Sequence, residues 1–216
     1  MMMLTRRHFG QAAGMATAVA LTAGALIAST QSATAEAIVG QPAPAFTGVT
    51  SNGETVSLDE LSGKTVVLEW TNHGCPFVQK HYDESRTNMQ GLQASAAEDG
   101  IVWLSVISSA PGKQGHVTGA EANDLTETRG ASPSSVILDP AGDIGRAYGA
   151  KTTPHMYVIT SDGTLAYNGA IDSIASANID DIDAAENYVI AALDSVASGE
   201  AADPSTTRPY GCSVKY

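Results

Sequence analysis

The sequence predicts a single α/β domain, a mixed sheet that carries helices on both faces. Short apolar runs at 66–70 and 101–107 have the length and composition of buried central strands. Helical patterns alternate with such runs, which is typical of sheets that contain parallel strands. Turn signals at 51–53 and 161–163 indicate antiparallel hairpins near the two ends of the domain.

Each predicted element has its own local signal. Strands are predicted from apolar runs, helices from apolar side chains at helical spacing, and turns from Asn-Gly or Asp-Gly pairs. Asp139-Pro140 ends one strand, and Gly149 ends one helical turn. The expected order is strands at 46–50, 55–58 and 66–70, a helix from 75 to about 97, a strand at 101–107, a helix at 120–129, a strand at 136–138, a helical turn at 144–148, strands at 156–159 and 165–168, and a helix at 182–196.

Composition excludes several classes of protein. The chain has 216 residues, of which 43% are hydrophobic and 16% charged, as in folded rather than disordered chains. The formal net charge of −12 argues against a nucleic-acid partner and against anionic membrane surfaces, since both require a basic face. Two cysteines allow one disulfide, which excludes a disulfide-rich scaffold.

The first 35 residues have the pattern of an export signal rather than of the domain. Arg6 and Arg7 precede an uncharged, Ala-rich stretch, and the small residues 33–35 match a cleavage position. The run Thr-Arg-Arg-x-Phe resembles the core of a bacterial twin-arginine signal, which implies a periplasmic protein with no stable membrane association after cleavage. An uncleaved membrane anchor is the alternative, because the apolar run is just short of the usual length of about 20 residues.

The remaining chain is interpreted as a domain at 36–199 and a polar tail at 200–216. Cys75 lies in the domain and Cys212 in the tail. An oxidising compartment allows a disulfide to persist, so a structural or catalytic redox role is expected for this pair.

Cys75 has the sequence context of a reactive thiol. It follows the predicted strand at 66–70 and opens a helix, with Pro76 at a first-turn position. A helix N-terminus favours thiolate over thiol, and the thiolate is the nucleophile. The alternative is a buried structural cysteine.

Three neighbours are candidate tuning groups for this thiol. They are His73, His155 and Glu69, of which Glu69 could accept a proton through water. A hydrogen-bonded structural histidine and a carboxylate at a polar strand edge are the alternatives. A metal site of Cys75, His73, His81 and Cys212 matches no common ligand spacing.

Further along the chain, these residues resemble a known family. Gly74-Cys75-Pro76 between a strand and a helix, Thr153-Pro154 before a strand, and Asp162-Gly163 between the last two strands resemble the thioredoxin fold. Four segments are similar to the redoxin branch of that fold, the alkyl hydroperoxide reductase and thiol-specific antioxidant family, and within it to a peroxiredoxin-like subgroup. These segments are 68–82, 145–150, 152–156 and 208–216.

The resemblance implies a role for each residue. Cys75 is the attacking thiolate, and Pro154 is a cis-proline that faces it. Thr153 exposes backbone groups on which an extended substrate can pair. The implied substrate is a disulfide or a peroxide, an external thiol is the electron donor, and no bound cofactor is needed. An ordinary edge-strand proline is the alternative for Pro154.

The sequence departs from the family pattern at three places. Val78 stands where thioredoxins carry their second cysteine, and Asn72 stands where peroxiredoxins usually carry Thr or Ser. No Lys or Arg occurs between Thr152 and Arg208, although peroxiredoxins bring an Arg to the peroxide from this region. The usual peroxide-activating set is therefore incomplete, and Asn72 is a further candidate tuning residue.

Cys212 is then the only thiol within the chain that could resolve an adduct on Cys75. The tail is expected to be mobile and to return to Cys75 from a distance, with Cys212 near the free thiol pKa. A static Cys75–Cys212 disulfide and a pairing with another chain are alternatives. The favoured function is an exported thiol-dependent oxidoreductase. The rival is a non-catalytic binding or structural domain with a permanent disulfide, and copper delivery is a third option.

Overall fold

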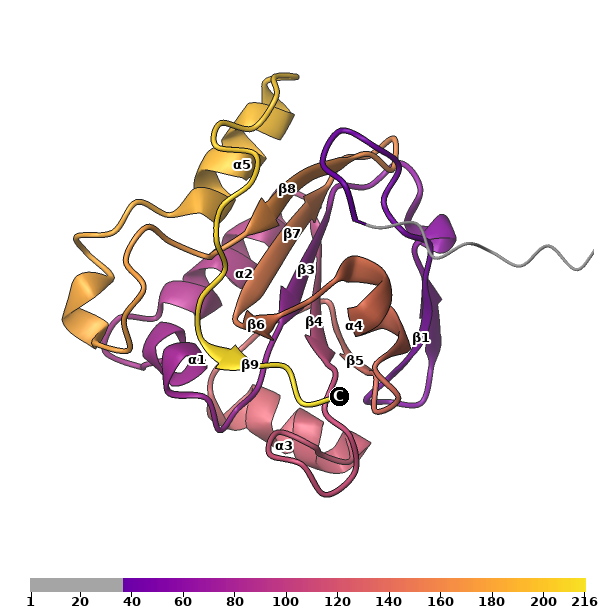
Figure 1. Ribbon diagram of the computed structural model, residues 1–216, viewed down its shortest axis with the longest axis vertical. Helices are drawn as coiled ribbons and strands as arrows, with labels where there is room; N and C mark the ends of the chain where they lie inside the picture. The colour runs from indigo at the N-terminus through magenta and orange to yellow at the C-terminus, as the bar shows by residue number, and fades with distance from the viewer. Residues whose placement is uncertain (1–36) are drawn as a thin grey trace, which may run out of the picture. The chain divides into compact units, whose positions relative to one another are not determined.

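The computed structural model describes residues 37–216, so the predicted signal at 1–35 lies outside the described residues. Seven strands form one mixed sheet in the order β2-β1-β5-β4-β3-β7-β8 (Figure 1). The strands of this sheet are β1 (Thr47–Thr50), β2 (Thr55–Ser57), β3 (Val66–Trp70), β4 (Val102–Ile107), β5 (Ser135–Leu138), β7 (His155–Ile159) and β8 (Leu165–Gly169). The helices are α1 (Pro76–His81), α2 (Asn88–Glu98), α3 (Gly119–Thr128), α4 (Asp143–Tyr148) and α5 (Tyr188–Ala197).

Strand β3 is the centre of the sheet. It pairs in parallel with β4 and antiparallel with β7, and all five of its residues are buried. Strands β1 with β2 and β7 with β8 form the two predicted hairpins. The apolar run at 66–70 is buried because helices cover both faces of the strand, as its composition predicted.

Apolar clusters lie on both faces of the sheet. Residues of α1, α2 and α5 pack with β3, β4 and β7 on one face, and Ala122 of α3 packs there on Ile107 and Val136. On the other face, Ile144 and Tyr148 of α4 pack with β3 and with the segment before β1. The predicted fold class, a thioredoxin-like mixed sheet with helices on both faces, is confirmed.

The single helix expected from 75 to 97 is wrong, since the structure has two helices there. Helix α1 ends at His81 and α2 begins at Asn88. Thr87 has a left-handed backbone (φ 48°) that no continuous helix can contain. Tyr82, just after α1, packs in the apolar cluster and donates its hydroxyl to the carboxylate of Glu69. The last helix is also shorter than expected, since α5 begins at Tyr188 and not at 182. Asn187 has an extended backbone, and its side chain caps the helix by accepting from the N–H groups of Val189 and Ile190.

The C-terminal tail (residues 200–216) is packed against the domain and is not a free polar segment. Figure 1 shows it in yellow, running from the end of α5 to strand β9 (Cys212–Ser213), which pairs with β6 (Thr152–Thr153). Backbone hydrogen bonds tie the tail along its length. They join Asn168 N–H to Ser205 O (3.1 Å), Thr207 N–H to Asn168 O (3.2 Å), Val214 N–H to Lys151 O (3.0 Å) and Ala110 N–H to Lys215 O (2.8 Å).

Among residues 37–216, no helix has the length and apolar character that a bilayer span requires.

Candidate active site

Cys75 lies in a turn between the central strand and helix α1. Its backbone N–H donates to Asn72 O (3.0 Å), and the Asn72 side chain accepts from Gly74 N–H (2.9 Å). Pro76 occupies the first turn of α1, as predicted. Asn72 therefore shapes the turn that presents Cys75, which is a positioning role rather than contact with the thiol. The Cys75 side chain is 0% exposed.

The loop before β7 lies directly on the thiol. The Thr153–Pro154 peptide bond is cis, the form that the resemblance implied. The Cys75 thiol donates to the carbonyl oxygen of Thr153 at 3.1 Å. Thr153 is itself buried, so this contact is shielded from solvent.

Strand β9 brings the second cysteine to the same place. Cys212 is the register partner of Thr153, and the Thr153 hydroxyl donates to Cys212 O (3.4 Å). Because Thr153 contacts both residues, residues 137 positions apart in the sequence become neighbours. Both thiols are free in this structure.

The pKa values of the two thiols are shifted in opposite directions. Burial acts to raise the pKa of Cys75, but the net shift is downward. The hydrogen bonds that favour the thiolate come first from the thiol and backbone N–H of Cys212, then from the side-chain hydroxyl of Thr153 and the backbone N–H of Val78. Burial, followed by the hydrogen bond and charge of Cys75, raises the pKa of Cys212 to about 11. Cys75 is thus the more acidic of the two thiols, and Cys212 keeps its proton to a higher pH.

Two expectations about the tail are corrected by this geometry. Cys212 does not return from a distance, because strand pairing already holds it beside Cys75. Its pKa does not stay near the free value, because burial, and after it the hydrogen bond and charge of Cys75, raise it. The sequence indicated a low thiol pKa for Cys75 from the helix N-terminus, whereas the first favourable contribution comes from Cys212.

A buried polar cluster anchors the tail two residues before Cys212. The Tyr210 hydroxyl donates to Asp172 and lies 3.2 Å from Nε2 of His81. Lys80 Nζ donates to the same Asp172 carboxylate at 3.2 Å, and the side chains of both Lys80 and His81 are 0% exposed. The Tyr210 ring also packs edge-on against Phe77 of α1. The helix that follows Cys75 therefore holds the segment that carries Cys212.

This cluster, which we call the Tyr210 anchor (Lys80, His81, Asp172 and Tyr210), was not identified from the sequence. His81 appeared there only as a poor metal-ligand candidate, and Asp172 carried no local signal. The one available signal was the similarity of segments 68–82 and 208–216 to the same family, since the anchor joins these two segments.

Glu69 is fully buried on β3, so the alternative of a carboxylate at a polar strand edge is wrong. Its carboxylate accepts hydrogen bonds from four side chains. The donors are Tyr82 (2.8 Å), Trp103 (2.9 Å), Ser105 (3.0 Å) and Gln93 (3.3 Å). Four donors compensate the loss of hydration, which explains how a carboxylate is accommodated in the core. Among the described residues, no hydrogen bond joins Glu69 to Cys75.

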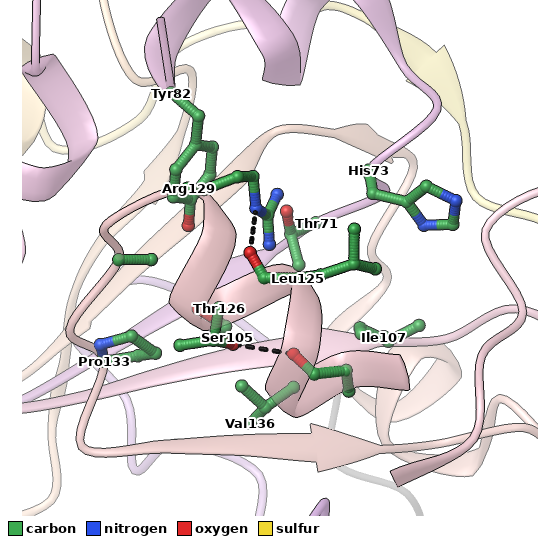
Figure 2. Close-up of a pocket in the computed structure, with 12 residues that line it drawn as sticks. Thr71, His73, Tyr82, Ser105, Ile107, Leu125, Thr126, Arg129, Pro133 and Val136 are labelled. Carbon is green, nitrogen blue, oxygen red and sulfur yellow. Dashed lines mark hydrogen bonds between the residues drawn. The ribbon is translucent and has the colours of Figure 1, made fainter. Parts of the chain in front are cut away.

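A small cavity lies beside the Glu69 network and beneath α3 (Figure 2). Its volume of about 10 Å³ is close to the least that a single water molecule needs. Thr71, His73 and Ser105 line it, and the buried hydroxyl of Thr71 has no hydrogen-bond partner among residues 37–216. Cys75 does not line this cavity. His73 is therefore placed toward α3, where burial and then Arg129 lower the pKa of its ring.

His155 lies on the opposite face of the sheet from Cys75. Alternation along β7 places it with Tyr157, whose ring it contacts, whereas Met156 and Val158 pack in the cluster that contains Cys75. Its Nε2 is paired with Asn168 Oδ1 at 2.8 Å, and its Nδ1 accepts from Lys151 N–H at 3.2 Å. Its proposed tuning role is not supported, and it is a hydrogen-bonded structural histidine.

The contribution of Cys212 to the acidity of Cys75 is testable with two variants. Cys212→Ser keeps a hydrogen-bond donor beside Cys75, and Cys212→Ala removes it. We expect a higher pH midpoint for Cys75 alkylation in Cys212→Ala, and a midpoint below about 8.5 in Cys212→Ser. Iodoacetamide rates measured against pH provide both values. Equal midpoints in the two variants would show that the side chain at 212 does not act on Cys75.

The buried histidines predict an acid-side loss of stability. Burial lowers the pKa of His81 and of His155 to about 4, from an ordinary 6.5. The unfolded chain therefore binds more protons between these values, so the free energy of unfolding falls as pH drops from about 6.5 toward 4. The expected loss at pH 5 is about 1–2 kcal/mol for each histidine.

Urea unfolding at several pH values checks this expectation. His81→Gln and His155→Gln should each give a shallower pH dependence than the unaltered protein, whatever their stability at neutral pH. His116→Gln, outside both buried groups, is the matched control. A slope that is the same in all four proteins would contradict the assignment.

Comparison with known proteins gives a consistent family. The model of the AhpC/TSA family matches residues 39–168. An uncharacterized conserved protein from Geobacillus kaustophilus has 21% identity and a TM-score of 0.69, over 83% of this chain and 93% of its own. A hypothetical protein from Sinorhizobium meliloti 1021 has 19% identity and a TM-score of 0.68, over 83% and 94%. At this identity these two structures support the fold alone.

No curated protein matches the chain. The family match spans more than half of the sequence and contains β3, Cys75 and the Thr153–Pro154 turn that lies on it. With a thioredoxin-like sheet and a buried, acidic thiol at the end of its central strand, this chain belongs to the AhpC/TSA family of redoxins.

Proposed function

We propose that this protein is an exported thiol-dependent oxidoreductase in which Cys75 attacks the substrate and Cys212 resolves the adduct. One observation carries the proposal: pairing of β9 with β6 holds Cys212 beside Cys75 through their shared neighbour Thr153. Family membership supports thiol redox chemistry in general. The substrate is a peroxide or a disulfide, and an external thiol returns the electrons.

The first step uses the acidic thiol. With a hydroperoxide, the Cys75 thiolate forms an S–O bond while the O–O bond breaks, and the alkoxide that leaves takes a proton from solvent. Cys75 becomes a sulfenic acid. With a disulfide, an S–S bond to one half forms and the other half leaves as a thiolate. The hydrogen bonds from Cys212 and Thr153 stabilise the attacking thiolate in both cases.

The second step depends on a change at Cys212. While Cys75 is a thiolate, its charge and hydrogen bond help to keep Cys212 protonated. Once Cys75 is bonded to oxygen or to a second sulfur, these two influences disappear and only burial still raises the pKa of Cys212. Cys212 then attacks the Cys75 sulfur, and water or the second thiolate leaves. The first step therefore activates the resolving thiol.

The disulfide that results is reduced from outside. A dithiol donor supplies two electrons and two protons and becomes a disulfide itself, which restores both thiols. No bound cofactor takes part in this cycle, because the two cysteines carry the electrons.

The two single variants should differ in kind. Cys75→Ser removes the nucleophile, so no adduct is expected with any oxidant. Cys212→Ser keeps the first step, so a sulfenic acid or a trapped mixed disulfide should accumulate on Cys75. Mass spectrometry after one equivalent of oxidant distinguishes them. Trapping through Cys212 in Cys75→Ser, with an inert Cys212→Ser, would reverse the roles and contradict the proposal.

Export is proposed from the first 35 residues. Arg6-Arg7 before an uncharged Ala-rich stretch supports twin-arginine transport to the periplasm. Replacing both arginines with lysine should leave the precursor in the cytoplasm, because that route reads the pair itself. Cell fractionation with an antibody to the protein measures this. Undiminished export of the double variant through the same route would contradict the assignment.

A further inference from the structure

The edge of β6 is filled by the chain's own tail. An unpaired strand edge can take up an extended peptide through backbone hydrogen bonds, which is a common mode of protein recognition. In this structure Thr152 and Thr153 pair with Ser213 and Cys212, and Val214 N–H continues the contact to Lys151 O. An extended protein disulfide that approached Cys75 on this edge would have to displace β9.

The close approach of the tail to the Thr153 carbonyl requires a glycine at position 211. A Cβ atom at position 211 would lie 2.0 Å from the carbonyl oxygen of Thr153, and the φ of Gly211 is +123°. Both facts exclude other residues unless the strand moves away. The Thr153 carbonyl also accepts from the Cys75 thiol, so the glycine approaches at the reactive centre itself.

The Tyr210 anchor holds β9 in place from the residue just before Gly211. Tyr210 donates to Asp172, whose carboxylate is buried with Lys80 and His81. Withdrawal of Tyr210 would leave its place in this buried cluster unfilled, which costs free energy because buried polar groups lose a partner. Lifting β9 is therefore opposed on both sides of Gly211.

The strand that covers Cys75 is also the strand that activates it. Cys75 is 0% exposed beneath the tail, and the thiol and backbone N–H of Cys212 favour its thiolate. A substrate that displaces β9 removes both donors at the moment of attack. A small oxidant that enters by a local opening keeps them in place.

We propose that β9, held by Gly211 and Tyr210, is a specificity element that restricts Cys75 to small oxidants and excludes extended protein disulfides. This inference rests on the proposed function, since it assumes that Cys75 attacks an oxidant. The chemistry is that already given, an S–S bond to Cys75 formed as the substrate S–S bond breaks. The difference lies only in which disulfides reach the thiol.

The experiment compares two disulfides on the reduced full-length mature protein. Rates of oxidation are measured with bis(2-hydroxyethyl) disulfide as the small reagent and with insulin as the protein disulfide. Gly211→Ala displaces β9 from Thr153. Gly199→Ala is the matched control, because Gly199 also has a positive φ (+72°) but no atom lies within 4 Å of its added Cβ. Tyr210→Phe, which removes the hydroxyl from the anchor, is an independent second variant.

The readout is the ratio of the rate with insulin to the rate with the small disulfide. A change in the acidity of Cys75 affects both rates and cancels in this ratio. Gly211→Ala should raise this ratio about tenfold or more, because two or three backbone hydrogen bonds no longer oppose peptide pairing. Tyr210→Phe should raise it by less, and Gly199→Ala should leave it unchanged.

An unchanged ratio in both Gly211→Ala and Tyr210→Phe would overturn the inference while leaving the proposed function intact. If Cys75 reacted with hydrogen peroxide but with neither disulfide in any of the proteins, the specificity inference alone would be overturned. If it reacted with neither disulfide nor with hydrogen peroxide, the proposed function itself would fail, and the specificity inference with it. The two failures are therefore distinguishable in one set of rates.

Discussion

The pairing of Thr153 with Cys212 is the contact on which the site depends. It places a second thiol beside Cys75 although 137 positions of the sequence separate the two cysteines. The strand that makes this contact covers Cys75, and the thiol and backbone N–H of Cys212 favour the Cys75 thiolate. Without it, only Thr153 and Val78 would remain to favour the Cys75 thiolate.

Two buried polar networks hold the elements around this contact: the Glu69 network on the central strand and the Tyr210 anchor between the tail and α1. Glu69, on the central strand, is satisfied by four donors and ties β3 to β4 and to α2. The Tyr210 anchor ties the tail to α1, the helix that Cys75 precedes. Removing one member of such a network leaves the others unpaired in the interior, so each network fixes its elements strongly. The turn that carries Cys75 thus lies between a strand fixed by the Glu69 network and a helix fixed by the Tyr210 anchor.

Sequence reasoning recovered the parts of the fold that have local signals. The apolar run of β3, the two hairpin turns and the position of Cys75 before a helix follow from residue patterns within a few positions. The break between α1 and α2 had no such signal. It depends on the attraction of Tyr82 to a carboxylate on another element and on a left-handed Thr87, without glycine or proline to mark it.

The site was recovered only in part for the same physical reason. Cys75, Thr153 and Pro154 were identified together, but His155 was named as a candidate tuning group although its side chain lies on the face of β7 away from Cys75. The sequence did not settle which face of β7 meets the thiol. A strand of two residues, β9, is too short for a pattern to predict. The need for glycine at 211 and the pairing of Tyr210 with Asp172 arise from contacts between distant segments.

The central claim is that packing of the tail on Cys75 lowers the pKa of Cys75 and raises that of Cys212. A ¹³Cβ NMR titration of both cysteines in the reduced, unaltered protein tests this most directly, because it follows each thiol without substitution. We predict two separate steps: Cys75 titrates below the free thiol value of about 8.5, and Cys212 titrates near a pKa of about 11. Two cysteines that titrate together near the free value would contradict the account.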